Sequence, residues 1–443
     1  MKTHLKLSAA VAALALLGGC GALKGKGPAR TPIVGQRVPI LASENLAEVD
    51  PALANLQVVL PLPETNANWA QPGGNPSKSM GHVALGDTLS QLWSARIEGG
   101  NTRTRLAAAP VVADGRLYVI DVNGMVTAMA ADTGATVWTA RTVKGDENPR
   151  ARFGGGVSVD GNRAFATDGL GDVVAFDTAD GKEVWRAKPG GPLRGAPTVA
   201  NNQVYVVSQD NQLFALDQAD GKVVWTQSGS LESQGVFGVA APASAQGTVV
   251  AGFSSGELNA YRYENGRSVW GDSLSRTSAS TSVSALADID AEPVIDNGRV
   301  YAVGQGGRMV ALELTSGQRL WEQNLAGIST PWVAGEWIFV VTDDARLLCI
   351  SRGSGKLRWV QQLPGFRNLK KRKNPIGWVG PILAGNRLLL ANTEGQLVSV
   401  ATADGSITTT QETRSKAGYT LSPVVANGVL YLLDDAGELT AWK

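Results

Sequence analysis

The side chains that most often carry out catalysis or bind metals are scarce in this sequence. Its 443 residues include two histidines, His4 and His82, and two cysteines, Cys20 and Cys349. So few imidazole and thiol groups exclude most histidine-based acid–base catalysis and the usual zinc sites. The 40 Lys and Arg residues are balanced by 39 Asp and Glu residues, so nucleic acid is not an expected partner.

Short catalytic motifs are also missing. Gly-Lys occurs at 181–182, 221–222 and 355–356, but no Ser or Thr follows the lysine, as a Walker A loop would require. The sequence has no Gly-x-Ser-x-Gly nucleophile elbow. The pairs Asp343-Asp344 and Asp434-Asp435 are interpreted as turn residues rather than as a calcium loop. These patterns favour a protein that is not an enzyme.

The one position with predicted covalent chemistry is Cys20. Basic Lys2 and Lys6 precede an apolar run over 7–17, which is too short to cross a bilayer as a helix. The tetrapeptide that ends at Cys20, Leu-Gly-Gly-Cys, resembles a bacterial lipobox, in which cleavage precedes the cysteine and the thiol is acylated. We predict a signal peptide over 1–19 and a lipid anchor at Cys20; an ordinary signal peptide with a chance cysteine is the alternative.

The stretch from 20 to 65 lacks a sustained hydrophobic period. Gly-Lys-Gly-Pro at 25–28 and Pro-Leu-Pro at 61–63 favour extended chain. We therefore predict a flexible tether over 20–65, with one short helix near 45–56. Gly21 and Ala22, rather than an Asp, follow the lipobox, and resemblance to lipoprotein sorting then implies the outer membrane, with the folded part facing the periplasm.

An internal repeat is the strongest structural signal in the chain. The pattern Ala-x-Asp-x-x-x-Gly-x-x-x-Trp occurs at 175–185 and again at 215–225. Weaker copies end at Trp138, Trp270, Trp321, Trp359 and, with the tryptophan lost, Thr409. An apolar Pro-Val-Val type segment, a turn and a second apolar segment precede the copies. Four short antiparallel strands at this period predict propeller blades, with the indoles packed between neighbouring blades.

The number of blades follows from the two ends of the chain. Seven units are complete, and residues 423–441 supply three further strands before the sequence ends at Lys443. The segment 89–93 near the N-terminus is an orphan outer strand. We predict an all-β fold over 66–443, an eight-bladed β-propeller of four-stranded antiparallel blades, closed by an N-terminal strand that completes the C-terminal blade.

The repeat over 89–443 resembles the tryptophan-docking repeat of the PQQ-type (quinoprotein) propellers. That superfamily has an enzymatic branch, the quinoprotein dehydrogenases, and a non-enzymatic branch that includes the BamB family of outer-membrane protein assembly factors. The dehydrogenases use adjacent cysteines, a bound Ca²⁺, a catalytic Asp and long insertions. Here Cys349 alone remains once Cys20 is lipidated, and the repeat units leave little room for insertions.

Resemblance to the BamB family implies a non-enzymatic scaffold lipoprotein of the β-barrel assembly (BAM) complex without a cofactor. It would bind BamA, other BAM components and nascent outer-membrane proteins. The alternative is a PQQ-dependent quinoprotein oxidoreductase or a PQQ-binding sensor. A lipoprotein scaffold for another envelope complex is a third possibility.

The same resemblance suggests partner-binding residues. Asp288 and Asp290 match an Asp-x-Asp of the family that contacts BamA, and we expect two exposed carboxylates pointing the same way. The loop at 233–242 occupies the place where many members carry Leu-x-Leu-Arg-Gly. Its first Leu and its Arg are replaced, so the resemblance leaves an apolar contact through Val236 and Phe237. Two solvated loops are the alternative.

Two other segments stand out. Residues 68–75 resemble the entry segment of alphaproteobacterial members of the family, and Trp69 is expected to pack on an apolar spot of one propeller face. The run 367–373 contains five positive charges. It is interpreted as a solvated loop, with anionic lipid head groups or an acidic partner as alternatives.

Overall fold

The fold is seen in a computed structural model of the chain. The structure describes residues 48–101, 104–145, 153–231, 238–275 and 287–443. The predicted signal peptide, Cys20, Val236 and Phe237 lie outside these ranges. Residues 47–443 form one compact unit. In the described ranges all regular structure is β, and these ranges contain no helix of the length and apolar character needed to cross a membrane.

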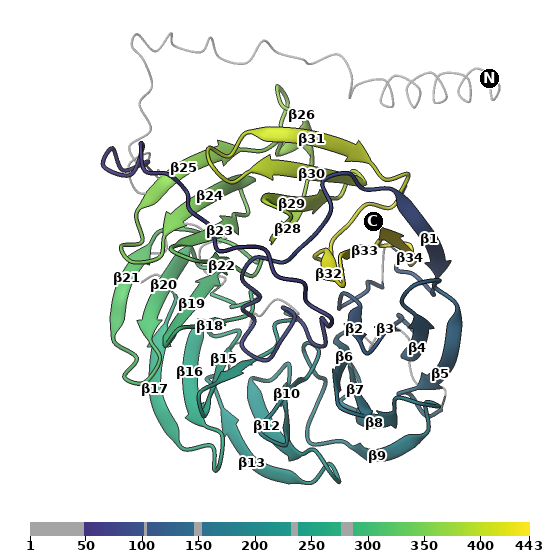
Figure 1. The fold of residues 1–443 in the computed structure, drawn as a ribbon. Helices are drawn as coiled ribbons and strands as arrows, with labels where there is room; N and C mark the ends of the chain where they lie inside the picture. The colour runs from purple at the N-terminus through teal and green to yellow at the C-terminus, as the bar shows by residue number, and fades with distance from the viewer. Residues whose placement is uncertain (1–47, 102–103, 146–152, 232–237, 276–286) are drawn as a thin grey trace, which may run out of the picture. The chain divides into compact units, whose positions relative to one another are not determined.

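Eight four-stranded antiparallel sheets form a ring (Figure 1), and we number these blades 1 to 8 along the chain. Blades 1 to 4 comprise β2 (Val111–Ala113), β3 (Arg116–Ile120), β4 (Met125–Ala130) and β5 (Thr136–Arg141); β6 (Gly155–Asp160), β7 (Arg163–Asp168), β8 (Val173–Asp177) and β9 (Glu183–Ala187); β10 (Thr198–Ala200), β11 (Gln203–Val207), β12 (Gln212–Asp217) and β13 (Val223–Ser228); and β14 (Ala243–Ala245), β15 (Thr248–Gly252), β16 (Glu257–Arg262) and β17 (Ser268–Ser273). Blades 5 to 8 comprise β18 (Val294–Asp296), β19 (Arg299–Gly304), β20 (Arg308–Glu313) and β21 (Arg319–Gln323); β22 (Trp332–Ala334), β23 (Trp337–Val341), β24 (Arg346–Ser351) and β25 (Leu357–Gln362); β28 (Trp378–Ala384), β29 (Arg387–Asn392), β30 (Gln396–Ala401) and β31 (Ile407–Glu412); and β32 (Val424–Ala426), β33 (Val429–Leu433), β34 (Glu438–Trp442) and β1 (Gln91–Arg96). A two-stranded hairpin, β26 (Phe366–Asn368) and β27 (Lys373–Pro375), lies between blades 6 and 7.

The ring is closed by the two ends of the folded chain, as the sequence predicts. Strand β1 pairs antiparallel with β34, and Ser94 faces Thr440 in the register. The backbones of Ser90 and Lys443 exchange two hydrogen bonds just beyond this ladder. Blade 8 therefore takes its outer strand from the N-terminal side, and the eight-bladed prediction is confirmed.

The repeated tryptophans pack between blades. The ring of Trp225 in blade 3 lies over Gly266 of blade 4, where an added Cβ would come within 2.7 Å of the indole. Its Nε1–H donates to the carbonyl oxygen of Tyr263 at 2.7 Å. Seven indoles pack on a glycine of the next blade in this way, and each donates a hydrogen bond to a carbonyl oxygen of that blade: Trp93, Trp138, Trp185, Trp225, Trp270, Trp321 and Trp359. The docking glycine and the donated hydrogen bond explain the spacing of the repeat.

The structure explains why the eighth position of the repeat is Thr409 rather than a tryptophan. Thr409 is exposed on β31, facing the junction of blades 7 and 8. In blade 8 the turn that would carry the docking glycine does not exist, because β34 ends the chain and β1 begins a separate segment. An indole at 409 would have no glycine to pack on.

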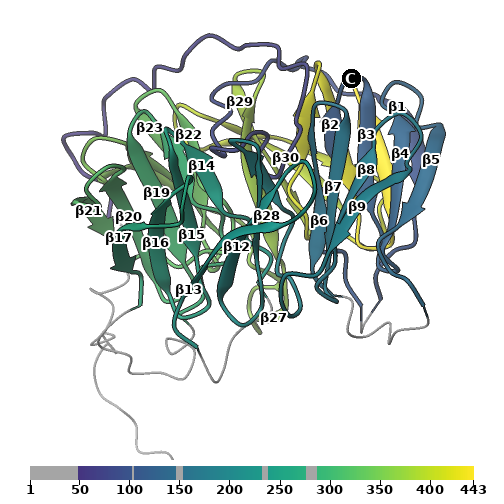
Figure 2. The same cartoon turned by 90° about the horizontal axis from the view of Figure 1, so that it is seen from below.

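The segment before β1 runs along the inner strands of the whole ring, and we call residues 66–83 the N-terminal circuit. The side view in Figure 2 shows the N-terminal part of the chain crossing one face. Hydrogen bonds join the circuit to the innermost strand, or the turn just after it, of every blade: β32 with Asn66, β2 with Trp69, β6 with Ala70, β10 with Gln71, β14 with Pro76, β18 with Ser77, β22 with Gly81 and β28 with Val83. Trp69 is buried and stacks on Trp332, as expected of a packing residue.

The predicted tether over 20–65 is too long at its C-terminal end. Val49 bridges Leu357 on the outer edge of β25, and the carboxylate of Asp50 pairs with Lys356 at 2.5 Å. Residues 51–55 form a turn rather than the expected helix. The segment from residue 49 onward packs on the propeller because it covers an otherwise open sheet edge.

Candidate functional site

The inter-blade connections lie at the other end of the innermost strands, on the face opposite the circuit. We call this the loop face and the opposite one the circuit face. Arg194, just before β10, is a deeply buried charged side chain on the loop face, with 1% of its surface exposed. Its Nη2 donates to Asp288 Oδ1 at 2.7 Å and to Asp290 Oδ1 at 3.1 Å. These three residues form what we call the Arg194 cluster.

The structure corrects the expectation of two exposed carboxylates. Asp288 is 1% exposed, and the side chain of Asp290 is 10% exposed. Both carboxylates point in one direction, as expected. The cation that they meet is Arg194 of the same chain rather than a residue of a partner. The reason is burial: two like charges in a tight loop need a cation when they leave water.

Three successive inter-blade connections meet in this cluster. Gly238, before β14, lies between the ions. A Cβ on Gly238 would fall 1.8 Å from Asp290 Oδ1 and 1.9 Å from Arg194 Nη2, so only glycine fits. Gln305 donates to Asp290 Oδ2 at 3.0 Å and so adds the β19–β20 turn. The cluster therefore holds the entrances to blades 3, 4 and 5 in one fixed arrangement.

Burial also changes the protonation of the cluster. Loss of water raises the pKa of Asp290 to about 6, with a further rise from Asp288, while Arg194 opposes both. Burial raises the pKa of Asp288 as well, and the guanidinium only partly offsets it. Two carboxylates share one cation, and Arg194 Nε, Arg194 Nη1 and Asp288 Oδ2 lack hydrogen-bond partners among the described residues. Under-satisfied buried polar groups of this kind are unusual outside functional sites.

Sequence reasoning missed Arg194, although a signal was present. Leu193-Arg194-Gly195 carries the Leu-Arg-Gly that we sought one connection later, at 233–242. Leu193 is fully buried, and an added Cβ on Gly195 would fall 1.9 Å from the carbonyl oxygen of Val239. The match at 193–195 thus has a packing reason for each residue. The contact predicted through Val236 and Phe237 stays a prediction, because both residues lie outside the described ranges.

The described residues do not fit the cofactor chemistry of the quinoprotein branch. Cys349 is buried in β24, where burial raises the pKa of its thiol, and it has no neighbouring cysteine. Within the described ranges no group of three or more His, Cys, Asp or Glu side chains could hold a metal ion. His82 is a buried structural residue, with Nδ1 at 2.8 Å from the Pro61 carbonyl oxygen.

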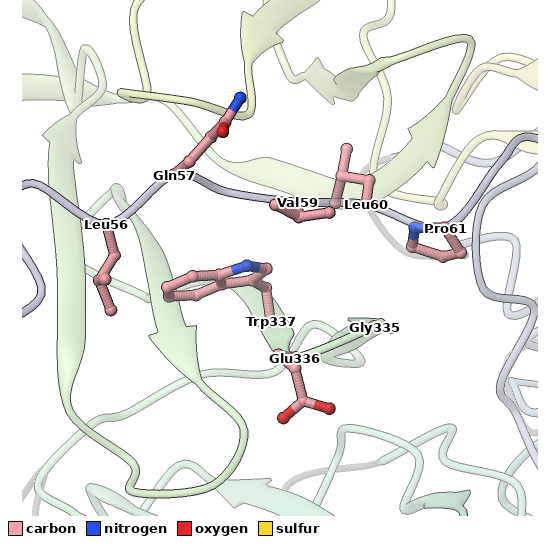
Figure 3. Close-up of a pocket in the computed structure, with 8 residues that line it drawn as sticks. All are labelled: Leu56, Gln57, Val59, Leu60, Pro61, Gly335, Glu336 and Trp337. Atoms are coloured by element: carbon pink, nitrogen blue, oxygen red, sulfur yellow. The ribbon is translucent and has the colours of Figure 1, made fainter.

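A shallow apolar groove lies on the circuit face (Figure 3). It has a volume of about 500 Å³ and is bounded by Leu56, Val59 and Leu60 on one side and by Trp337 on the other. Gln57 and Glu336 are its polar side chains. In Figure 3 the carboxylate of Glu336 points away from the indole, so the groove has no converging polar groups to orient a ligand.

Comparison with known proteins agrees with this geometry. The family profile described as outer membrane protein assembly factor BamB matches residues 80–151 and 122–361. The chain is 33% identical over 357 residues to outer membrane protein assembly factor BamB of Salmonella typhimurium, covering 80% of this chain and 88% of that protein. The crystal structure of BamB from Moraxella catarrhalis superposes with a TM-score of 0.68 at 19% identity, covering 80% of this chain and all of that one. Quinohemoprotein alcohol dehydrogenase from Comamonas testosteroni shares the fold, with a TM-score of 0.64 at 14% identity over 85% of this chain and 80% of that one.

Proposed function

Because the chain belongs to the family of outer membrane protein assembly factor BamB, we propose that it is a non-enzymatic scaffold of the outer-membrane β-barrel assembly machinery. In this role it binds BamA through the loop face and supports the folding and insertion of outer-membrane proteins. The Arg194 cluster is the observation that carries the proposal, since its fixed loops offer a preorganised docking surface. The relative that is 33% identical over 80% of this chain is named an assembly factor, which supports a role without catalysis.

The cluster supports binding by positioning rather than by direct contact. Arg194 and Asp288 are too deeply buried to present their charges to a partner. They hold the connections at 188–197, 238–242 and 287–293 in one fixed arrangement. Surface groups on these loops therefore lose little conformational entropy when a partner binds. This differs from the exposed acidic spot expected from the sequence, and it makes Arg194 a positioning residue.

The test compares two buried ion pairs, one on each face. Arg194→Ala breaks the loop-face cluster. Arg352→Ala is the matched control, because Arg352 Nη2 pairs with Asp296 Oδ2 at 2.5 Å on the circuit face, where Ser79 of the circuit also binds Asp296. Both variants should lose stability, but only Arg194→Ala should reduce co-purification of BamA, by tenfold or more. Equal BamA recovery for the two variants, at equal folded fraction, would contradict the proposed docking face.

Membrane attachment is proposed to depend on acylation of Cys20. Several acyl chains hold a protein stably at a bilayer. Cys20→Ala should therefore leave the propeller folded but move it from the membrane fraction to the soluble fraction. A variant that still pellets with membranes would rule out the lipobox interpretation.

Nascent barrel strands are proposed to pair with the open outer edges of the blades. Five outer strands expose an aliphatic side chain directly before the docking tryptophan: Leu92, Val137, Val184, Val224 and Leu320. On β25 the equivalent residue is Arg358, which donates to the Leu56 carbonyl oxygen at 2.7 Å, and residues 49–56 cover that edge. At its start this edge accepts one residue of the chain itself, Val49, through a single parallel bridge to Leu357.

The covered edge provides the control for this mechanism. A photo-crosslinking residue at Val184 should capture an unfolded outer-membrane protein, whereas the same residue at Arg358 should not. Equal capture at both positions would argue against pairing at the edges. Quinone absorbance and dye-linked alcohol oxidation after addition of PQQ and Ca²⁺ would instead support the oxidoreductase alternative.

A further inference from the structure

The run of positive charges at 367–373 forms a defined β-hairpin. Phe366 pairs with Pro375 and Asn368 with Lys373, and the backbone N–H of Lys371 donates to Asn368 Oδ1 at 3.0 Å. The hairpin extends from the loop face between blades 6 and 7, and Figure 2 shows β27 at the opposite rim from the circuit. Every residue from 367 to 375 is exposed.

The hairpin tip combines positive charge with an apolar side chain. Leu369 has 69% of its surface exposed and precedes Lys370, Lys371, Arg372 and Lys373. Among the described residues none of these four cations forms an ion pair, whereas Arg367 at the base pairs with Glu394. An exposed leucine and solvated cations are each ordinary on a protein surface, but their combination at one hairpin tip suits an interface where head groups meet acyl chains.

A neighbouring loop extends the positive surface. The backbone N–H of Thr413 donates to the carbonyl oxygen of Gly395, which places the loop after β31 against the turn that holds Glu394. Arg414 and Lys416 in that loop are exposed and, within the described ranges, have no ion-pair partner. The hairpin and this loop together carry seven cations, and the neighbouring carboxylates are Glu394, Glu412 and Asp434, which accepts a hydrogen bond from Ser415 of the loop.

We propose that the 366–375 hairpin, with Arg414 and Lys416, binds an anionic phospholipid leaflet at the side of blades 6 and 7, across the ring from the Arg194 cluster at the entrances to blades 3 to 5. The partner chemistry is a surface of phosphate head groups over acyl chains: the cations bind the phosphates and Leu369 enters the head-group layer. The inference goes beyond the proposed scaffold role and uses only its lipid anchor, which would keep the hairpin close to a membrane.

The exposed leucine at the hairpin tip favours a lipid partner over an acidic protein. Val49 and Asp50 contact Leu357 and Lys356 at the start of β25, and the hairpin follows the other end of that strand. The stretch from Cys20 to residue 47 can span at most about 100 Å. Acylation at Cys20 would thus hold blade 6 within reach of the leaflet, and the hairpin adds a second membrane contact that fixes the orientation of the propeller.

The experiment uses unlipidated residues 47–443, because this compact unit contains the complete ring and the circuit. Flotation is measured with vesicles of phosphatidylcholine alone and with vesicles that also contain phosphatidylglycerol. The unit should bind the anionic vesicles only. The double variant Lys370→Gln with Lys371→Gln should bind on the order of 25-fold less tightly, about fivefold for each charge.

Matched variants test the two parts of the surface. Lys182→Gln with Lys222→Gln removes the same charge from exposed turns next to docking glycines, and it should leave vesicle binding unchanged. Leu369→Ser should weaken binding a few-fold while leaving all charges in place. Thermal melts of every variant show whether the ring is intact.

The possible outcomes separate this inference from the scaffold role. Equal flotation of the wild type and the hairpin double variant would overturn the proposal, as would hairpin-dependent retention on immobilised polyglutamate without vesicle binding, which would indicate an acidic protein partner. The hairpin double variant should still co-purify with BamA. If Arg194→Ala fails to co-purify BamA while the hairpin double variant retains it, that result tests the scaffold role and not the binding of lipid.

Discussion

The two faces of the propeller are held together by different kinds of interaction. On the circuit face, hydrogen bonds from a single segment reach the inner strand or first turn of all eight blades, and most of these bonds involve backbone atoms. On the loop face, three connections are joined through the side chains of Arg194, Asp288 and Asp290. The first face is covered by its own chain, whereas the second leaves its loops free to meet a partner.

This difference indicates that the circuit face mainly stabilises the ring and the loop face mainly serves partner binding. Backbone hydrogen bonds depend little on side-chain identity. The circuit therefore holds the blades together even when exposed side chains are changed. An ion cluster depends on a few side chains, and one substitution can change it. Stability is therefore expected to be most sensitive on the circuit face, and partner binding on the loop face.

The largest effect is expected from removing the circuit together with β1. A chain that starts at 97 loses the outer strand of blade 8 and the circuit, and it should fail to form the ring. A chain that starts at 64 loses the segment on β25 and the groove residues up to Pro61 but keeps the circuit and β1, so it should still melt cooperatively and at a much higher temperature than the chain that starts at 97. Circular dichroism melts decide this, and equal melting temperatures would contradict the shared blade.

Trp69→Ala should have the next largest effect. The indole is 4% exposed and stacks on Trp332 with ring centroids 6.0 Å apart. Its loss should lower the free energy of unfolding by about 3–5 kcal/mol. Leu62→Ala is the control, because Leu62 is 85% exposed; chemical denaturation should show a change below about 0.5 kcal/mol. BamA recovery per folded molecule should not change for either variant.

Asp288→Ala should destabilise the protein by about 3 kcal/mol, because it leaves the buried Arg194 with one carboxylate partner fewer. An exposed loop residue would give less than about 0.5 kcal/mol. Chemical denaturation at neutral pH measures the difference. A negligible change would mean that the cluster does not join the loops as described.

The smallest effect concerns pH. The pKa of Asp290 is raised from 3.8 to about 6 in the folded protein, so the folded state binds more protons than the unfolded state between these values. The contribution of Asp290 to stability should be complete below about pH 4 and should be lost, by at most about 3 kcal/mol, as the pH rises through 6. Asp290→Asn should remove this slope in denaturation curves.

Asp180→Asn is the control for the pH experiment. Its carboxylate is exposed, and Lys182 lowers its pKa. This substitution should leave the decline between pH 4 and 7 in place. A decline that survives Asp290→Asn would have to come from another buried acid, such as Asp168, whose pKa burial also raises.

The sequence predicts the architecture well because each blade repeats the same requirements. The glycine of the docking turn, the indole and the strand pattern recur, so one error in a unit does not alter the count. The circuit was not predicted, since its hydrogen bonds come from the backbone and leave no periodic pattern. The burial of Asp288 and Asp290 depends on Arg194, 94 residues away along the chain, and no local pattern records such a pair.

The place where the circuit begins and ends has a mechanical consequence. Asn66 binds blade 8, and Val83 binds blade 7. These two blades border the one junction that lacks a docking tryptophan, at Thr409. The circuit thus starts and ends beside the junction of blades 7 and 8. A force that would separate these two blades is resisted by the hydrogen bonds that join the circuit to the inner strands of the whole ring.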